Sequence, residues 1–376
     1  AAGDFAGAEA ALRQALAQDR GTLAPWLNLA AVRRQRQDVD GAFDALREAL
    51  AVDARDFRAL LMSATLLEQI GHAKPAASAY GIALANAPPD SMLDPPTLKA
   101  VRHGREMQAK FARDMGDYLR AASAEVASQC TPAERRRREH FIGITLRVQP
   151  RYPQLPLEYY FPGLPPIGFH EREDFPWLAE FEAATPAIQA ELRTILAEDA
   201  AEFSPYIHYP DHLPLDQWRG LNNSPSWTAF HFYEQGKPIE AHCRRAPRTM
   251  EAIGLLPQAQ VPLRSPTALF SVLKPHTHIP PHTGVANFRL LVHLPLILPG
   301  QCRFRVGSET REWRLGEAWV FDDTIEHEAW HASDEPRVIL ICDLWTPYLS
   351  VEERQAIAQV IAATDAYNGT VPSASV

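Results

Sequence analysis

Six polar side chains that could bind a metal or an anion stand close together in this 376-residue chain. They are Ser271, His282, Arg289, His293, His327 and Arg337. His282 and His327 are 45 residues apart, and neutral imidazoles bind Fe, Zn, Cu and Ni alike. Arg337 follows His327 by ten residues, and a guanidinium is a natural bidentate receptor for a carboxylate. The stretch therefore predicts a metal site with an anionic ligand beside it.

Short apolar runs broken by Gly and Pro surround these residues between 269 and 345, which predicts a small antiparallel β-barrel or jelly roll. On a strand over 286–294, the two-residue alternation places Arg289, Leu291 and His293 on one face. An Arg on an inward face needs a charged or polar partner, because an isolated buried charge is costly. We expect an anionic ligand to be that partner.

Longer motifs in a fixed order carry a family resemblance over about 155–349. They are Tyr160-Phe161-Pro162-Gly163-Leu164, Phe175-Pro176-Trp177, Cys243-Arg244-Arg245-Ala246-Pro247, Pro281-His282-Thr283-Gly284, Phe321-Asp322-Asp323-Thr324-Ile325-Glu326-His327-Glu328 and Asp343-Leu344-Trp345. In this order and spacing they resemble the aspartyl/asparaginyl β-hydroxylase family of Fe(II)- and 2-oxoglutarate-dependent oxygenases. The resemblance implies an α+β multidomain chain with a double-stranded β-helix (jelly-roll) oxygenase domain over 151–376.

The resemblance also implies the ligands of the metal. His282 and His327 would be the catalytic residues that hold Fe(II), and no carboxylate completes the set. Gly284 stands where related oxygenases place a carboxylate ligand. Asp322 and Asp323 precede His327 too closely to bend back to the metal, so we expect a water-mediated contact at most, or simple capping of the turn.

The remaining candidates would bind the co-substrate. By resemblance, Ser271, His293 and Arg337 bind 2-oxoglutarate, and Arg289 faces the pocket shared by 2-oxoglutarate and substrate. With O2 as oxidant, the implied reaction hydroxylates an unactivated C–H bond and releases succinate and CO2. The implied substrate is the β-carbon of an Asp- or Asn-type residue in a peptide or protein, or a related small molecule.

Two departures from the family pattern bear on substrate and compartment. Members that hydroxylate acidic residues carry basic residues where this chain has Leu291 and Leu269, which weakens the expectation of an Asp side chain as substrate. Lumenal relatives pair the counterpart of Cys243 with a cysteine where Met250 stands here. The four cysteines are scattered, as suits reduced thiols, and we predict a cytoplasmic enzyme of bacterial type.

The first ninety residues repeat with a period of 34. The segment 7–16 returns at 41–50 and more loosely at 75–84, and 34 residues is the tetratricopeptide period. We therefore predict tetratricopeptide repeats over 1–90, with any Ala-rich helical bundle as the alternative. Animal members of the resembled family also carry such helices. The concave face of the repeats is the expected docking surface for a peptide or protein substrate.

A helical connector is predicted over 91–150. Thr131-Pro132-Ala133-Glu134 is a capping box, and the arginine run after it is expected to be a solvated helix face, with phosphate or membrane binding as the alternative. Six prolines between 149 and 166 indicate the domain boundary. Further predictions are a helix over 185–198, a strand over 227–233 and a last helix that begins after Ser350 and ends at Asn368-Gly369.

Composition excludes some partners. The net charge of -9 argues against nucleic acid, and no apolar run approaches the roughly 18 residues of a membrane span. A second hypothesis is a non-catalytic tetratricopeptide scaffold whose degenerate oxygenase domain senses 2-oxoglutarate. A second possible metal site is the pair His276 and His278, which leaves Arg337 unexplained. His331 is expected at the rim of the site.

Overall fold

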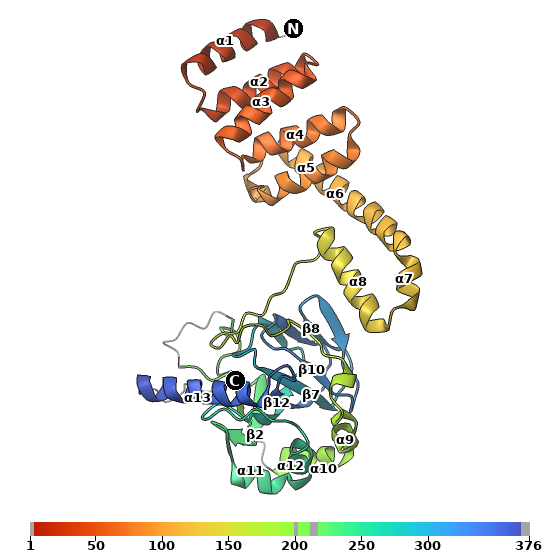
Figure 1. The fold of residues 1–376 in the computed structure, drawn as a ribbon, viewed down its shortest axis with the longest axis vertical. Helices are drawn as coiled ribbons and strands as arrows, with labels where there is room; N and C mark the ends of the chain where they lie inside the picture. The colour runs from red at the N-terminus through yellow and green to blue at the C-terminus, as the bar shows by residue number, and fades with distance from the viewer. Residues whose placement is uncertain (1–3, 199–201, 211–216, 370–376) are drawn as a thin grey trace. The chain divides into compact units, whose positions relative to one another are not determined.

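A computed structural model describes residues 4–198, 202–210 and 217–369. The chain forms two compact units, Ala1–Gln149 and Pro150–Val376 (Figure 1). The first unit is helical and the second is rich in β-sheet, which confirms the coarse outline of the predicted fold. None of the helices in the described ranges is long and apolar enough to cross a bilayer.

The first unit begins with five helices that follow the 34-residue period. They are α1 (Phe5–Gln18), α2 (Leu23–Gln35), α3 (Val39–Val52), α4 (Phe57–Gln69) and α5 (Ala73–Ala85). The first residues of α1, α3 and α5 are each 34 positions apart, and so are those of α2 and α4. Figure 1 shows these helices stacked in sequence order. Their assignment as tetratricopeptide repeats stays a prediction.

Small residues and side-chain caps explain this stacking. Ala45 and Ala49 on α3 and Ala64 on α4 are fully buried, so neighbouring helix backbones approach closely. Asp4 and Asp38 accept a hydrogen bond from the backbone N–H of the glycine three residues later, which satisfies one free donor of each helix start.

Three more helices complete this unit. They are α6 (Pro95–Ala122), α7 (Ala124–Gln129) and α8 (Pro132–Thr145), preceded by a 3-10 turn at Asp90–Met92. The predicted capping box is present, because Thr131 and Glu134 each bond the backbone N–H of the other. The domain limits predicted at 90 and 150 stay predictions.

The second unit is built on two antiparallel sheets. In order across the larger sheet, the strands are β1 (Ser204–Pro205), β2 (Trp227–His231), β5 (Ala268–Leu273), β12 (Arg337–Trp345), β7 (Arg289–Ile297) and β10 (Trp319–Phe321). The smaller sheet contains β6 (His278–His282), β11 (His327–His331), β8 (Cys302–Val306) and β9 (Glu309–Glu312). A short hairpin pairs β3 (Tyr233–Glu234) with β4 (Lys237–Pro238).

The two sheets share one apolar core. Leu291 and Ile341 of the larger sheet lie in the same buried cluster as Ile279, Phe304 and Ala329 of the smaller sheet. Two antiparallel sheets with facing apolar sides are the arrangement expected of a jelly roll. The candidate residues stand among these inward-facing side chains.

Helices cover the other face of the larger sheet. Ile188 and Leu192 pack with Leu290 and Val292 of β7, whose side chains alternate with those that face the shared core. The covering helices are α9 (Leu178–Ala183), α10 (Thr185–Glu198), α11 (Glu240–Arg245) and α12 (Pro247–Ile253), with a 3-10 turn at Arg172–Asp174. Helix α13 (Val351–Asn368) begins at the predicted Ser350 capping box and ends at Gly369, whose φ of 63° is left-handed.

Candidate functional site

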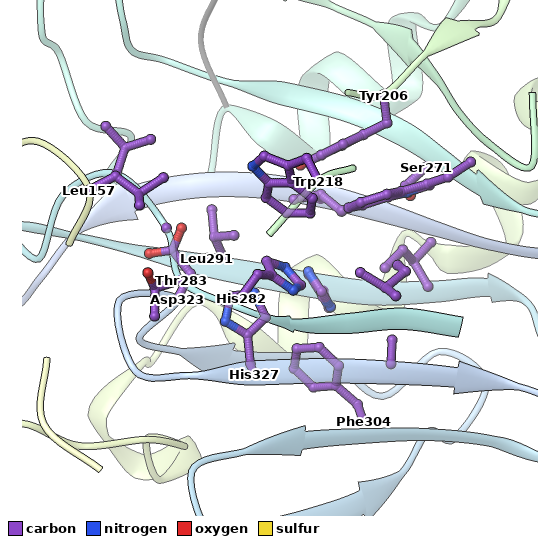
Figure 2. A pocket seen from close by; sticks show the side chains of 18 of the residues that line it. Leu157, Tyr206, Trp218, Ser271, His282, Thr283, Leu291, Phe304, Asp323 and His327 are labelled. Carbon is purple, nitrogen blue, oxygen red and sulfur yellow. The ribbon is translucent and has the colours of Figure 1, made fainter. Parts of the chain in front are cut away.

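His282 and His327 face each other across two paired strands. His282 ends β6, His327 begins β11, and the antiparallel register sets one opposite the other. Their ring centroids are 3.9 Å apart and both side chains are buried (Figure 2). The Nδ1 atoms lie 2.7 Å from the carbonyl oxygen of Pro280 and 3.1 Å from that of Ile325. A carbonyl only accepts, so each Nδ1 carries the proton and each Nε2 keeps a lone pair for a metal.

The two imidazoles are neutral at physiological pH. Burial lowers the pKa of His282 to about 4. Burial, and next the adjacent His282, hold the pKa of His327 well below its ordinary value. Metal ligation requires a deprotonated imidazole, so the pair is in the ionisation state that a metal needs.

Position 284 has no space for a side chain that could act as a third metal ligand. A Cβ atom built on Gly284 would lie 2.0 Å from Oδ2 of Asp323, so the Asp323 carboxylate fills the space that a side chain at 284 would need. Among the described residues, no group of three or more His, Cys, Asp and Glu side chains is arranged to hold a metal. The donor set at this position is therefore two imidazoles, which fits a borderline divalent metal such as Fe(II).

Asp323 is a buried carboxylate on the wall of the same pocket. Its Oδ1 atom has no hydrogen-bond partner within the described chain, and its Oδ2 atom lies 3.7 Å from Nη2 of Arg289. Burial raises the pKa of Asp323 to about 7, although the Arg289 charge acts in the opposite direction. The unpartnered oxygen gives Asp323 a free acceptor beside the two histidines.

Arg289 is a buried arginine that contacts two carboxylates. Its guanidinium lies between the Asp323 and Asp343 carboxylates, with Nη1 3.5 Å from Oδ2 of Asp343. Asp343 is itself fixed by the Ser265 hydroxyl and the Thr267 backbone N–H. Arg289 is not among the described residues that line the pocket. Its predicted cofactor-binding role stays a prediction that these contacts do not support.

Arg337 is a buried cation without a counter-ion. Its side chain is 2% exposed, forms no ion pair with any described residue, and lies with its guanidinium carbon 4.8 Å from the Trp313 ring centroid. Burial lowers the pKa of Arg337 to about 10, so it stays charged at pH 7. A buried charge of this kind is expensive unless an anion compensates it. The buried charge of Arg337 therefore favours the binding of an anionic ligand in this pocket.

Two further donors surround this cation. Nδ1 of His293 is buried without a hydrogen-bond partner in the described structure. The Ser271 hydroxyl accepts a hydrogen bond of 2.9 Å from Nε1 of Trp227, which leaves its own proton for a ligand. Both residues line one pocket with His282 and His327. The structure thus brings together five of the six candidates named from the sequence.

Other histidines lie outside this pocket. His276 is exposed and contacts Asp334, and His278 stacks on Trp330, so the alternative site formed by His276 and His278 does not face the pocket. His331 was expected at the rim, and that expectation is wrong. The side chain is only 3% exposed, with Nδ1 3.2 Å from Sγ of Cys302, because alternation along β11 turns it inward with His327.

Comparison with known proteins agrees with this site. A family model described as Aspartyl/Asparaginyl beta-hydroxylase matches residues 182–347, which include all six candidates. The human aspartyl/asparaginyl beta-hydroxylase is 34% identical over 149 residues, which are 39% of this chain and 19% of the human protein. Aspartate beta-hydroxylase domain-containing protein 2 of Xenopus tropicalis is 33% identical over 214 residues, 56% of this chain and 55% of that protein. Residues 182–347 of this chain therefore belong to the aspartyl/asparaginyl β-hydroxylase family.

A further relative has a name that describes a lipid hydroxylase, and the chain covers only part of each relative's length. The ornithine lipid ester-linked acyl 2-hydroxylase of Rhizobium tropici is 32% identical over 204 residues, 52% of this chain and 66% of that protein. The chain spans about a fifth of the human protein and just over half of the Xenopus one. A solved Cupin_2 domain from Enterobacter cloacae aligns with 32% of the chain at a TM-score of 0.22 and 9% identity, and takes no part in the assignment.

Aromatic residues that the sequence did not single out complete the lining of the pocket. Trp218 lies over His282, with ring centroids 4.6 Å apart, and Tyr206 stacks on Trp227 at 4.2 Å. Figure 2 shows Tyr206 and Trp218 above the two histidines. Alternation along 227–231 does place Trp227 on the inward face, whereas Trp218 lies in a turn outside any helix or strand and carries no such signal.

We expect Asp323→Ala to keep the metal. Its carboxylate is held by Arg289 and would reach a metal only through water, and losing such a contact costs about 10–100-fold in metal affinity. Fe(II) titration should therefore still give one bound metal per chain. Asp322→Ala, which removes a carboxylate bound to Gln154 and Thr324, is the matched control. Metal loss in Asp323→Ala as complete as in His327→Ala would make Asp323 a direct ligand.

Asp323→Asn should stabilise the metal-free protein more at pH 8 than at pH 5. The folded-state pKa of Asp323, about 7, lies above its ordinary value of 3.8, so the wild-type chain loses stability as pH rises through this interval. The uncharged amide avoids this loss. The increase in the free energy of unfolding caused by Asp323→Asn should therefore be roughly 2–3 kcal/mol larger at pH 8 than at pH 5, at 1.36 kcal/mol per pKa unit. Urea denaturation at both pH values measures it. An equal gain at pH 5 and pH 8 would contradict the assignment.

Proposed function

We propose that the second unit is an Fe(II)- and 2-oxoglutarate-dependent dioxygenase that hydroxylates an unactivated C–H bond. The observation that carries the proposal is a single pocket with two neutral imidazoles, whose ring centroids are 3.9 Å apart, and a buried arginine that has no counter-ion among the described residues. His282 and His327 would hold Fe(II). Iron, 2-oxoglutarate and O2 would together supply the oxidising chemistry and yield succinate and CO2.

The remaining residues would bind and orient 2-oxoglutarate. Arg337 would donate two hydrogen bonds to its distal carboxylate, and the fork geometry of a guanidinium suits this contact. Trp313 would keep the guanidinium plane fixed through the cation–π contact. Ser271 and His293 would add donors from the neighbouring strands β5 and β7. The co-substrate would thereby neutralise the positive charge that the fold leaves buried.

The pocket wall would exclude water from the reacting groups. Phe304 lies with its ring centroid 5.7 Å from that of His327, and Ile279 and Ile341 belong to the same buried cluster. A dry site strengthens the electrostatic contacts within it and protects the reaction from side products. These apolar side chains would also guide the target carbon toward the two histidines.

The family resemblance suggests an Asp- or Asn-type residue in a peptide or protein as the substrate class. The tetratricopeptide-like helices of the first unit would dock that polypeptide, and Met250 at the place of a lumenal disulfide cysteine supports a cytoplasmic setting. The name of the Rhizobium relative, in contrast, describes hydroxylation of an acyl chain.

Anaerobic spectroscopy tests the proposal directly. The wild-type chain should bind one Fe(II) and one 2-oxoglutarate and develop the visible charge-transfer band of that pair. His282→Ala and His327→Ala should lose the band and all substrate-dependent succinate release, because each removes one of two protein ligands. The absence of this charge-transfer band in the wild-type chain would contradict the proposal. A band without succinate release from any candidate substrate would favour the non-catalytic sensor.

Arg337→Ala should raise the KM for 2-oxoglutarate by about one to two decades, while the KM for substrate changes little. The loss corresponds to a charge-assisted contact of about 1.5–3 kcal/mol. Steady-state succinate assays over a range of 2-oxoglutarate concentrations measure it. Arg303→Ala is the matched control, because Arg303 also lies over a tryptophan ring, that of Trp330, but outside the pocket. An unchanged KM for 2-oxoglutarate in Arg337→Ala would exclude Arg337 as its receptor.

A further inference from the structure

Apolar and aromatic side chains form much of the pocket lining beside the candidate residues. Around the two histidines, the described lining includes Leu157, Trp218, Ile279, Val285 and Leu291. Figure 2 shows Leu157 and Leu291 on the side of the histidines that carries Thr283 and Asp323, and Trp218 above His282. A group that enters this part of the pocket meets hydrocarbon and aromatic surfaces, which favour an apolar occupant.

Arg289, the second buried arginine, does not offer its charge to this space. Its guanidinium lies within 3.7 Å of Asp323 and 3.5 Å of Asp343. Along β7, His293 and Leu291 line the pocket, whereas Arg289 on the same face does not. Strand β7 therefore presents Leu291 to the pocket, whereas the guanidinium of Arg289 contacts two carboxylates.

Among the lining residues that the structure describes, Arg337 is thus the cation available to a ligand, and the proposed function commits it to 2-oxoglutarate. The acidic residue on that wall is Asp323. A substrate carboxylate in this space would lose its hydration, would find no free cationic side chain among the described lining residues, and would face the Asp323 carboxylate. Each of these effects disfavours an acidic group.

We propose that the pocket selects an uncharged, largely apolar group as the part of the substrate that is hydroxylated, and that it rejects an acidic side chain. This inference rests on the proposed function and narrows its substrate class. Two sources share the required chemistry: an uncharged side chain of a polypeptide and the acyl chain of a lipid. Leu291 is the specificity-determining residue, because it occupies the lining position between His293 and the withdrawn Arg289.

Binding of matched probes to the full chain tests the inference. The probes are three host peptides that differ only in a central Asp, Asn or Leu, and N-decanoyl glycinamide as the acyl chain. Calorimetry is done anaerobically on chain loaded with Fe(II) and 2-oxoglutarate, so that no turnover intervenes. At least one uncharged probe should bind tenfold or more tightly than the Asp peptide. The Asn peptide isolates the effect of charge, and the better of the Leu and decanoyl probes identifies the source.

An Asp peptide that binds as tightly as every uncharged probe, or the absence of binding by all four, would overturn the inference. Leu291→Arg should reduce or reverse the affinity ratio between the best uncharged probe and the Asp peptide by tenfold or more. An unchanged order of probe affinities in that variant would also contradict the inference. Leu315→Arg makes the same exchange at an exposed site and should keep the wild-type ranking. The charge-transfer band is recorded on every sample. Its absence in the wild-type chain refutes the proposed function, whereas its presence with the wrong ranking refutes only this inference.

Discussion

The register between β6 and β11 is the constraint on which the site depends. His282 and His327 are opposite each other only because the pairing shifts by one residue between His327 and Ala329. Pro280 and Pro281 lie at this irregularity, and proline cannot donate the hydrogen bond that a regular ladder requires. A slip of one residue would turn one imidazole to the other face of the sheet. The proline pair that interrupts the strand thus helps to fix the geometry of the two imidazoles.

Charge compensation divides the pocket into two halves. The fold supplies Arg289 with two carboxylates, whereas within the described part of the chain Arg337 contacts an aromatic ring and no anion. The uncompensated half can accept a dianion such as 2-oxoglutarate, and the compensated half presents leucine, tryptophan and isoleucine side chains. Co-substrate and substrate would therefore be distinguished by charge before any specific hydrogen bond is formed.

Much of this site follows from local sequence patterns. Two-residue alternation places His293 and Leu291 on one face of β7, and the family resemblance of the motif around His327 predicts a metal ligand with no carboxylate ligand beside it. The capping boxes at Thr131 and Ser350 are equally local, because each joins residues three positions apart. In the first unit, the period of 34 residues recurs in the helix starts.

The rest depends on contacts between distant segments. Alternation places Arg289 on the inward face, but its withdrawal from the pocket depends on Asp323 and Asp343, which other strands and turns supply. The contact between Asp323 and Gly284 likewise joins two loops that are far apart in sequence. Trp218 lies over His282 although no periodic element contains it. No pattern along the chain encodes such tertiary contacts.

A crystal structure of the chain grown anaerobically with Mn(II) in place of iron and with 2-oxoglutarate tests the central claim most directly. The account predicts one metal ion bonded to Nε2 of His282 and to Nε2 of His327. It also predicts 2-oxoglutarate on the metal with its distal carboxylate on Arg337, and no bond from Asp323. A metal bonded to Asp323, or a 2-oxoglutarate molecule that leaves Arg337 without an anion, would contradict it.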